Sequence, residues 1–343
     1  FKAQPGALNS ELSDLIKQNK QEIISILADS QAIDVIEGSQ RAAIVRLNKQ
    51  KAPLSRAQEG IWIADRLKGG SAEYNMATSL RVSGDFSLTA ANDAFREIIQ
   101  ANEILRTSFV EVDGQPIQCV NPDFEFSIDT INVEHLSGEQ QHEFVEKELR
   151  QLNSRVFDLG KDLLIHVTYF SLGAKANEQQ GVLHFNIHHI ACDGWSMGIL
   201  IKSFSEHYRA FIEGRSCAAS HDALQYSDYA VWQRQWLNGE LFEEKLNFWQ
   251  TQLADAPKAH QLPRTNSNLI TEGTGRVLKS VVHSLRVDEL EKLAKQHNAT
   301  IFMAVHAAFN LVLSRYSNQF DFVVGTTVAN RMQSELQGIV GPF

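Results

Sequence analysis

Residues 183–196, Leu-His-Phe-Asn-Ile-His-His-Ile-Ala-Cys-Asp-Gly-Trp-Ser, hold the densest set of chemically active side chains in the sequence. The first half of this stretch alternates like a β-strand, and the Asp-Gly turn that follows begins an apolar helix. Since side chains alternate along a strand, His184, Asn186 and His188 are expected on one face. His189 is expected on the other face, so the adjacent histidines cannot both enter one cavity. The stretch therefore predicts a strand–turn–helix unit with one imidazole close to the free amides of a helix N-terminus, where a developing negative charge is stabilised.

The flanking sequence continues this alternation of strands and helices. Residues 90–102 place apolar side chains at helical spacing, and residues 109–120 form two strand-like runs around Asp113-Gly114, a pair that favours a tight hairpin turn. The apolar run 322–325 predicts a buried strand. Together these patterns indicate an α/β fold.

Composition excludes several classes of function. The chain has 343 residues with 32 Lys+Arg and 41 Asp+Glu, a net charge of −9, and it has no basic tract. A nucleic-acid or anionic membrane surface needs clustered basic residues, so neither partner is expected. No stretch of about 20 residues is free of charge and histidine, so no membrane-spanning segment is expected.

The three cysteines, Cys119, Cys192 and Cys217, are too few for a disulfide framework and match no zinc spacing, which indicates the reducing cytoplasm. The chain begins at Phe1 without Met and stops at Phe343, and both ends are expected to be cuts through a longer protein.

Other chemistries fit the histidine stretch less well. His184 and His188 have the spacing of zinc ligands on a helix rather than a strand, and no clear third ligand follows. A Gly-x-Ser-x-Gly nucleophile elbow, a phosphate-binding loop and a dinucleotide fingerprint are absent from the sequence. Cys192 is best interpreted as a small buried residue. What remains is a histidine acting as base or positioning group in transfer between two bound substrates.

The stretch HHIACDGWS (188–196) resembles the HHxxxDG motif of condensation domains in non-ribosomal peptide synthetases, which have the chloramphenicol-acetyltransferase-like fold. Four further stretches resemble motifs of that family in the family's order. They are LSRAQEGIW (54–62, compared with SxAQxRxW), NEILRTSF (102–109, compared with RHExLRTxF, with its first two positions different), YSDYAVW (226–232, compared with YxDFAVW), and GTTVANR with IVGPF (325–331 and 339–343, compared with the last core region).

This resemblance implies a two-lobed α/β fold of the chloramphenicol-acetyltransferase type and a role for each residue of the motif. His189, the second histidine, is expected to deprotonate or orient an acceptor amino group that attacks a thioester. Asp193 is expected to be structural and to pair with an arginine, for which Arg106 is the candidate. Gly194 keeps the start of the helix open to substrate, and His188 is expected to pack or to form hydrogen bonds.

The resemblance also implies a domain organisation. The apolar spacing of residues 8–27 predicts an amphipathic helix without a local partner, and residues 1–30 resemble part of an N-terminal docking domain that receives the C-terminal tail of an upstream synthetase subunit. Residues 31–52 are expected to be a linker. Residues 53–218 are expected to be the first lobe, and residues 219–343 a second lobe that is truncated.

The implied activity is amide bond formation between two thioesters, a donor acyl or peptidyl group and an acceptor aminoacyl group. Each is held on the 4′-phosphopantetheine arm of a carrier protein, so the chain itself is expected to bind no cofactor and no metal. Trp195 precedes Ser196, which counts against an epimerisation domain, and the two histidines count against a heterocyclisation domain. A coenzyme-A-dependent acyltransferase and a non-catalytic docking or scaffold fragment remain as alternatives.

Overall fold

The computed structural model describes residues 43–175, 178–215, 223–263, 280–282 and 284–343. Contacts divide them into two compact units: the described residues up to Asn238 with Ala329–Phe343, and Gly239–Val328. Every residue of the histidine stretch lies in the first unit. The expected docking segment at 1–30 and the expected lobe boundary at 218/219 lie outside the described residues.

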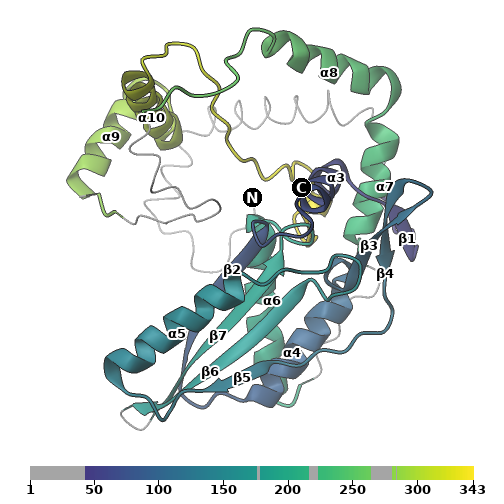
Figure 1. Cartoon of the computed structure of the whole chain (residues 1–343), viewed down its shortest axis with the longest axis vertical. Helices are drawn as coiled ribbons and strands as arrows, with labels where there is room; N and C mark the ends of the chain where they lie inside the picture. The colour runs from purple at the N-terminus through teal and green to yellow at the C-terminus, as the bar shows by residue number, and fades with distance from the viewer. Residues whose placement is uncertain (1–42, 176–177, 216–222, 264–279, 283) are drawn as a thin grey trace, which may run out of the picture. The chain divides into compact units, whose positions relative to one another are not determined.

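A four-stranded sheet forms the centre of the first unit (Figure 1). Its strand order is β2-β7-β6-β5, with β5 parallel to β6 and the other pairs antiparallel. The strands are β2 (Asn75–Ser83), β5 (Asp129–Asn132), β6 (Ile165–Lys175) and β7 (Glu178–His188). The first half of the histidine stretch is therefore the end of an inner strand, and α6 (Gly194–Ile212) begins directly after the turn that follows it.

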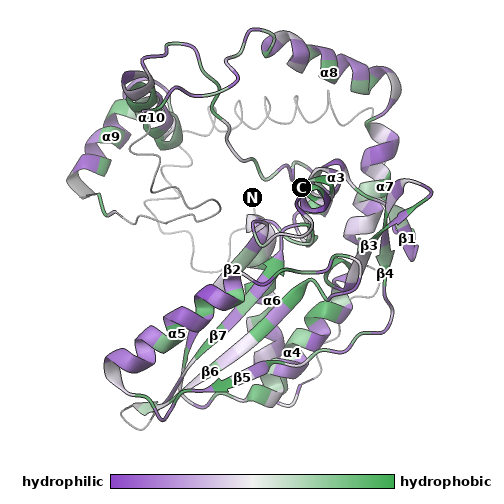
Figure 2. Cartoon of the chain, viewed as in Figure 1, coloured by the Kyte–Doolittle hydropathy of each residue, from purple (hydrophilic) through white to green (hydrophobic). Residues whose placement is uncertain are grey.

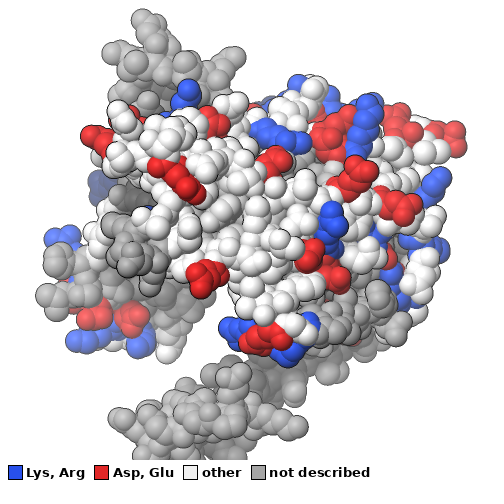
Figure 3. Space-filling model, turned by 90° about the horizontal axis from the view of Figure 1, so that it is seen from below, with Lys and Arg blue, Asp and Glu red and all other residues white. Residues whose placement is uncertain are grey.

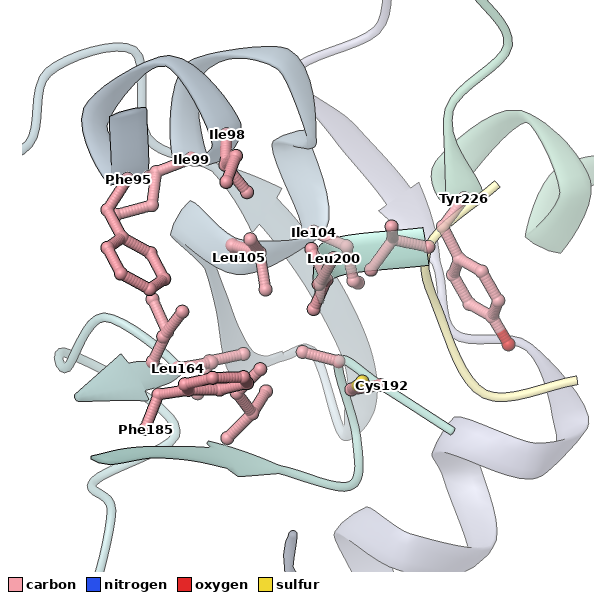
Figure 4. Close-up of a cluster of buried hydrophobic side chains, with 14 of the residues drawn as sticks. Phe95, Ile98, Ile99, Ile104, Leu105, Leu164, Phe185, Cys192, Leu200 and Tyr226 are labelled. Carbon is pink, nitrogen blue, oxygen red and sulfur yellow. The ribbon is translucent and has the colours of Figure 1, made fainter. Parts of the chain in front are cut away.

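An apolar layer covers one face of this sheet. The helices α4 (Leu88–Ala101) and α6 contact each other on this face, and Phe95 of α4 packs against Phe185 of β7 and Phe204 of α6 with ring centroids 6.0 and 4.8 Å apart. Figure 4 shows Phe95 and Phe185 within a cluster that extends to Cys192 and Tyr226. Burial of this cluster is the main stabilisation of the first unit.

The opposite face of the sheet carries a row of buried polar side chains beneath α5 (Gly138–Asn153). His184, Asn186 and His188 lie on this face, as the strand alternation predicts, and each is almost completely buried. Asn186 Nδ2 donates to the carbonyl of Leu152 near the end of α5 at 2.9 Å, and His184 Nδ1 lies 2.9 Å from Ser79 Oγ on β2. Figure 2 shows that α5 itself is mostly hydrophilic. Polar contacts thus contribute to holding this helix on the sheet.

A second sheet of three strands, in the order β1-β4-β3, adjoins the first. It consists of β1 (Lys51–Pro53), β3 (Thr107–Val112) and β4 (Gln115–Val120). Asp113 and Gly114 form the turn between β3 and β4 with φ of 51° and 76°, which confirms the predicted hairpin. Three helical elements complete the neighbourhood: α3 (Arg56–Lys68), the 3₁₀ turn η1 (Glu103–Arg106) and α7 (Tyr226–Trp236).

The described part of the expected linker, residues 43–52, is fastened to the first unit. Arg46 contacts Glu103 at 2.6 Å and the buried carboxylate of Asp228 at 3.3 Å. The backbone amide of Leu47 also donates to Asp228 at 2.9 Å, and β1 begins at Lys51. Residues 43–52 therefore pack against the first unit, whereas they were expected to belong to a linker.

The second unit contains three helices among its described residues, α8 (Gly239–Gln252), α9 (Ser284–Gln296) and α10 (Ile301–Ser317). Residues 322–325 form no strand and are not buried, so that prediction is wrong: no described strand pairs with this apolar run. None of the described helices is long and apolar enough to cross a membrane. Figure 3 shows basic and acidic side chains interspersed on one face of the molecule.

Burial of the two strand histidines makes stability depend on pH. Burial lowers the pKa of His184 and of His188 to about 4, with smaller contributions from His166 and His189 respectively. In the unfolded chain both imidazoles take up a proton near pH 6.5, whereas in the folded chain they do so only near pH 4. The free energy of unfolding is therefore highest above pH 6.5 and decreases as the pH falls toward 4. At about 1.4 kcal/mol per pKa unit, each histidine accounts for at most roughly 3 kcal/mol.

We expect His184→Gln to flatten the fall in the free energy of unfolding between pH 7 and pH 4.5, measured by urea titration. His142→Gln on the exposed surface of α5 is the matched control and should follow the wild type. Equal pH dependence in wild type and His184→Gln would contradict the burial argument.

Candidate active site at the strand–helix junction

The chain leaves β7 at His188 and makes a tight turn before α6 begins. Within this turn the amide of Ala191 donates to the carbonyl of His188 at 2.9 Å, and that of Cys192 donates to the carbonyl of His189 at 3.3 Å. The amide of His189 donates to the carbonyl of Tyr74, next to β2, at 2.7 Å. The backbone of His189 is thus held both from within the turn and from the neighbouring segment.

His189 is the partly exposed imidazole of this turn. It lies one residue beyond the end of the strand and is only half-buried, whereas His188 is fully buried. The Nδ1 atom of His189 is buried and has no hydrogen-bond partner among the described residues. The ring is therefore placed by its backbone, without an orienting carboxylate from the part of the chain that the structure describes.

His188 contacts two aromatic rings and forms one hydrogen bond. Its ring centroid lies 6.2 Å from that of Tyr74 and 6.1 Å from that of Phe157, and its Nδ1 accepts a hydrogen bond from the amide of Ile190 at 3.2 Å. Because burial lowers its pKa to about 4, the ring is neutral at pH 7. His188 thus stabilises the turn through its hydrogen bond with the amide of Ile190.

Asp193 caps the first turn of α6. Its Oδ1 accepts hydrogen bonds from the backbone amide of Ser196 at 2.7 Å and from the Ser196 hydroxyl at 2.6 Å. A carboxylate at this position satisfies a free helical amide and interacts favourably with the helix dipole. Asp193 therefore fixes where the helix starts.

The expected pairing of Asp193 with an arginine is present, but the partner is Arg331 and not Arg106. The Arg331 Nη2 atom lies 3.0 Å from both carboxylate oxygens of Asp193 and also donates to Ser196 Oγ at 2.9 Å. The other terminal nitrogen, Nη1, donates to the carbonyls of Leu336 and Ile339, and the guanidinium lies 4.0 Å from the ring centroid of Phe343. Arg331 thus joins residues 336–343 to the start of α6.

Arg106 is directed elsewhere. It lies at the end of η1, and its guanidinium donates to the backbone carbonyls of Asn121 at 2.7 Å and Gln100 at 3.4 Å. Both arginines belong to motif-like stretches of the sequence, so the motifs alone did not decide between them. The feature of the sequence that favours Arg331 is its position just before the apolar segment 336–343, which packs into the core of the same unit.

Gly194 and Trp195, the first two residues of α6, are both exposed. Gly194 is exposed, and a β-carbon added to it would meet no atom within 4 Å. Trp195 is 49% exposed, and its indole Nε1 donates to the carbonyl of Gln337 at 3.0 Å. The backbone at Gly194 is therefore not obstructed by neighbouring described atoms, and the role expected of Gly194 stays a prediction.

Other groups near the junction are unsuited to catalysis. Cys192 is fully buried, and burial followed by the charge of Asp193 raises the pKa of its thiol, so it is not a nucleophile. The described residues contain no group of three or more His, Cys, Asp or Glu side chains placed to hold a metal ion. A cavity of about 830 Å³ between α3, β3 and residues 156–162 does not include His189. The junction, and not this cavity, carries the histidine motif.

Comparisons with known proteins show the family of the chain. The model of the condensation-domain family matches residues 48–343. One of the linear gramicidin synthase proteins of Brevibacillus parabrevis is 33% identical over 296 residues, which are 86% of this chain and 6% of that protein. Gramicidin S synthase 2 of Brevibacillus brevis is 31% identical over 300 residues, which cover 85% of this chain and 6% of that protein.

Solved structures show the same fold. The first condensation domain of the CDA synthetase has a TM-score of 0.69 at 20% identity, over 85% of this chain and 68% of that one. The four-domain nonribosomal peptide synthetase AB3403 has a TM-score of 0.71 at 25% identity, over 88% of this chain and 22% of that one.

The chain therefore belongs to the condensation-domain family, and the expected α/β fold of the chloramphenicol-acetyltransferase type is confirmed. It spans about 6% of the length of the linear gramicidin and gramicidin S synthases that it matches.

The two assignments of the arginine partner differ in a measurable way. A double-mutant cycle between Asp193→Asn and Arg331→Met should give a coupling energy of about 1–3 kcal/mol in urea unfolding, because the pair is in direct contact and Arg331 is buried. The same cycle with Arg106→Met should give a coupling close to zero. A larger coupling to Arg106 than to Arg331 would show that the pairing with Arg331 is wrong.

Proposed function

We propose that this chain forms an amide bond between a donor acyl or peptidyl thioester and the amino group of an acceptor aminoacyl thioester. The two thioesters are carried on the 4′-phosphopantetheine arms of donor and acceptor carrier proteins. The observation that carries this proposal is the junction itself, in which the family's histidine motif holds His189 half-exposed beside an open helix start.

The charges at the junction support transfer between two bound substrates. The carboxylate of Asp193 is occupied by Arg331 and Ser196, the thiol of Cys192 is buried, and the ring of His188 is neutral. This leaves His189 as the accessible base of the motif. A reaction with these groups needs the nucleophile to come from a substrate, which an amine supplies.

The chemistry balances without a further reactant. The amine nitrogen attacks the thioester carbonyl carbon, the C–N bond forms, and the C–S bond breaks with release of the donor arm as a thiol. One proton leaves the nitrogen and one is gained by the sulfur. His189 either takes this proton or accepts a hydrogen bond that orients the amine, and orientation in a closed site can supply a large part of the rate.

Replacement of His189 tests the proposal. Donor and acceptor carrier domains are loaded, mixed with the full-length polypeptide that contains this chain, and the product thioester is followed by mass spectrometry. We expect His189→Ala to lower the rate by roughly 10²- to 10⁴-fold, the usual contribution of a positioned acid–base group. His189→Gln separates the two roles: it should restore much of the rate if orientation dominates and little if proton transfer does.

His188 provides the matched control within the motif. Asn can accept the amide hydrogen bond of Ile190 in place of Nδ1, so His188→Asn should retain most of the rate, whereas His188→Leu should destabilise the turn. Equal loss in His189→Ala and His188→Asn would contradict the division of roles. Unchanged turnover in His189→Ala would rule out a catalytic role for it.

The N-terminal segment supports a second, separate proposal. The apolar spacing of residues 8–27 fits a docking helix, and we propose that residues 1–30 bind the C-terminal tail of an upstream synthetase subunit. Deletion of residues 1–30 should abolish capture of that upstream protein and leave amide formation from carrier domains supplied in excess unchanged. Loss of amide formation would place the segment in the fold instead, and acyl transfer from coenzyme A alone would favour the acyltransferase alternative.

A further inference from the structure

A buried glutamine connects the helix α3 to the histidine turn. Gln58 lies in the first turn of α3 and is completely buried. Its Nε2 donates to the carbonyl of Ile190, the residue that follows His189, at 3.3 Å. Residue 190 is thus held at both polar backbone atoms, because its amide donates to His188 Nδ1 at 3.2 Å.

Other buried groups hold the side chain of Gln58 in place. Its Oε1 accepts from the backbone amide of Ser55 at 3.0 Å and from Gln118 Nε2 on β4 at 3.3 Å. Gln118 Nε2 in turn donates to the carbonyl of Pro53 at 2.8 Å, and both Gln118 and Ser55 are buried. The amide of Gln58 therefore has one orientation, with its donor toward Ile190.

The position of this contact gives it a consequence beyond packing. The amide of His189 donates to Tyr74, which holds the peptide plane before His189. The plane after it is held by the Ile190 amide on His188 Nδ1 and by the bond between the His189 carbonyl and the Cys192 amide. Gln58 holds the following plane through the carbonyl of Ile190, so the backbone is held on both sides of His189. The ring of His189 has no partner for Nδ1 among the described residues and depends on this backbone for its position.

We propose that Gln58 is a positioning residue for His189 and acts on it through the carbonyl of Ile190. This inference rests on the amide-forming function proposed above. Without the donor, the carbonyl of Ile190 is left unsatisfied and the turn can rotate, and a displacement of about 1 Å at a reacting group is enough to cost on the order of 10²-fold in rate.

Gln58→Met keeps the length of the side chain and removes its donor. It also removes one half of the capping box that Gln58 forms with Ser55, so Ser55→Ala is the matched control, since it removes the other half and leaves the contact with Ile190. Gln118→Met leaves the capping box intact. It removes one of the two hydrogen bonds that orient the Gln58 side chain, together with the bond to the carbonyl of Pro53.

The rate constant of a single turnover, with the full-length polypeptide in excess over loaded carriers, is the measurement that separates positioning from stability. Misfolding lowers the amount of active protein, while displacement of His189 lowers the rate constant at saturation. We expect a fall of roughly 10- to 100-fold for Gln58→Met, a smaller fall for Gln118→Met, and a change below about threefold for Ser55→Ala. Gln118→Met carries the test if Gln58→Met does not fold.

Hydrogen exchange of the amides of residues 189–192 gives a second readout that needs no activity. Faster exchange there in Gln58→Met than in Ser55→Ala, at matched overall stability, is expected. Rate constants for Gln58→Met and Gln118→Met within threefold of the wild type, with unchanged exchange, would overturn the inference. An inactive wild type with the expected exchange pattern would instead contradict the proposed function and leave the contact as a property of the fold.

Discussion

The ion pair between Asp193 and Arg331 is the interaction on which the rest of the candidate site depends. Arg331 is buried and Asp193 is partly buried, and each member has further hydrogen bonds. A buried pair of this kind is costly to break because the remaining charge has no partner. It ties residues 336–343 to the start of α6 and so fixes the end of the turn that carries His189.

The residues of the histidine motif differ in how accessible they are to a substrate. His188 is buried and neutral beneath the turn, Asp193 is committed to the helix cap and to Arg331, and Gly194 leaves the helix start open. Hydrogen bonds to Ile190, Ser196 and Arg331 offset part of the cost of burying His188 and Asp193. His189 is half-exposed, and backbone hydrogen bonds of the turn fix its position.

The local part of this arrangement could be predicted from the sequence. Alternation placed His184, Asn186 and His188 on one face of a strand, and the Asp113-Gly114 pair predicted a hairpin, because both depend on neighbours in the chain. The arginine partner could not be chosen, since Arg331 is 138 residues from Asp193 and its contact is set by tertiary packing. The same limit explains the wrong strand at 322–325, where an apolar run has no described strand beside it.

A crystal structure of the full-length polypeptide with a non-hydrolysable aminoacyl-phosphopantetheine analogue would show directly where the acceptor amine binds. We expect the amine nitrogen within hydrogen-bond distance of the His189 imidazole, about 3 Å, at the open start of α6. An amine bound instead in the cavity between α3, β3 and residues 156–162, with the His189 ring facing no ligand atom, would contradict this expectation.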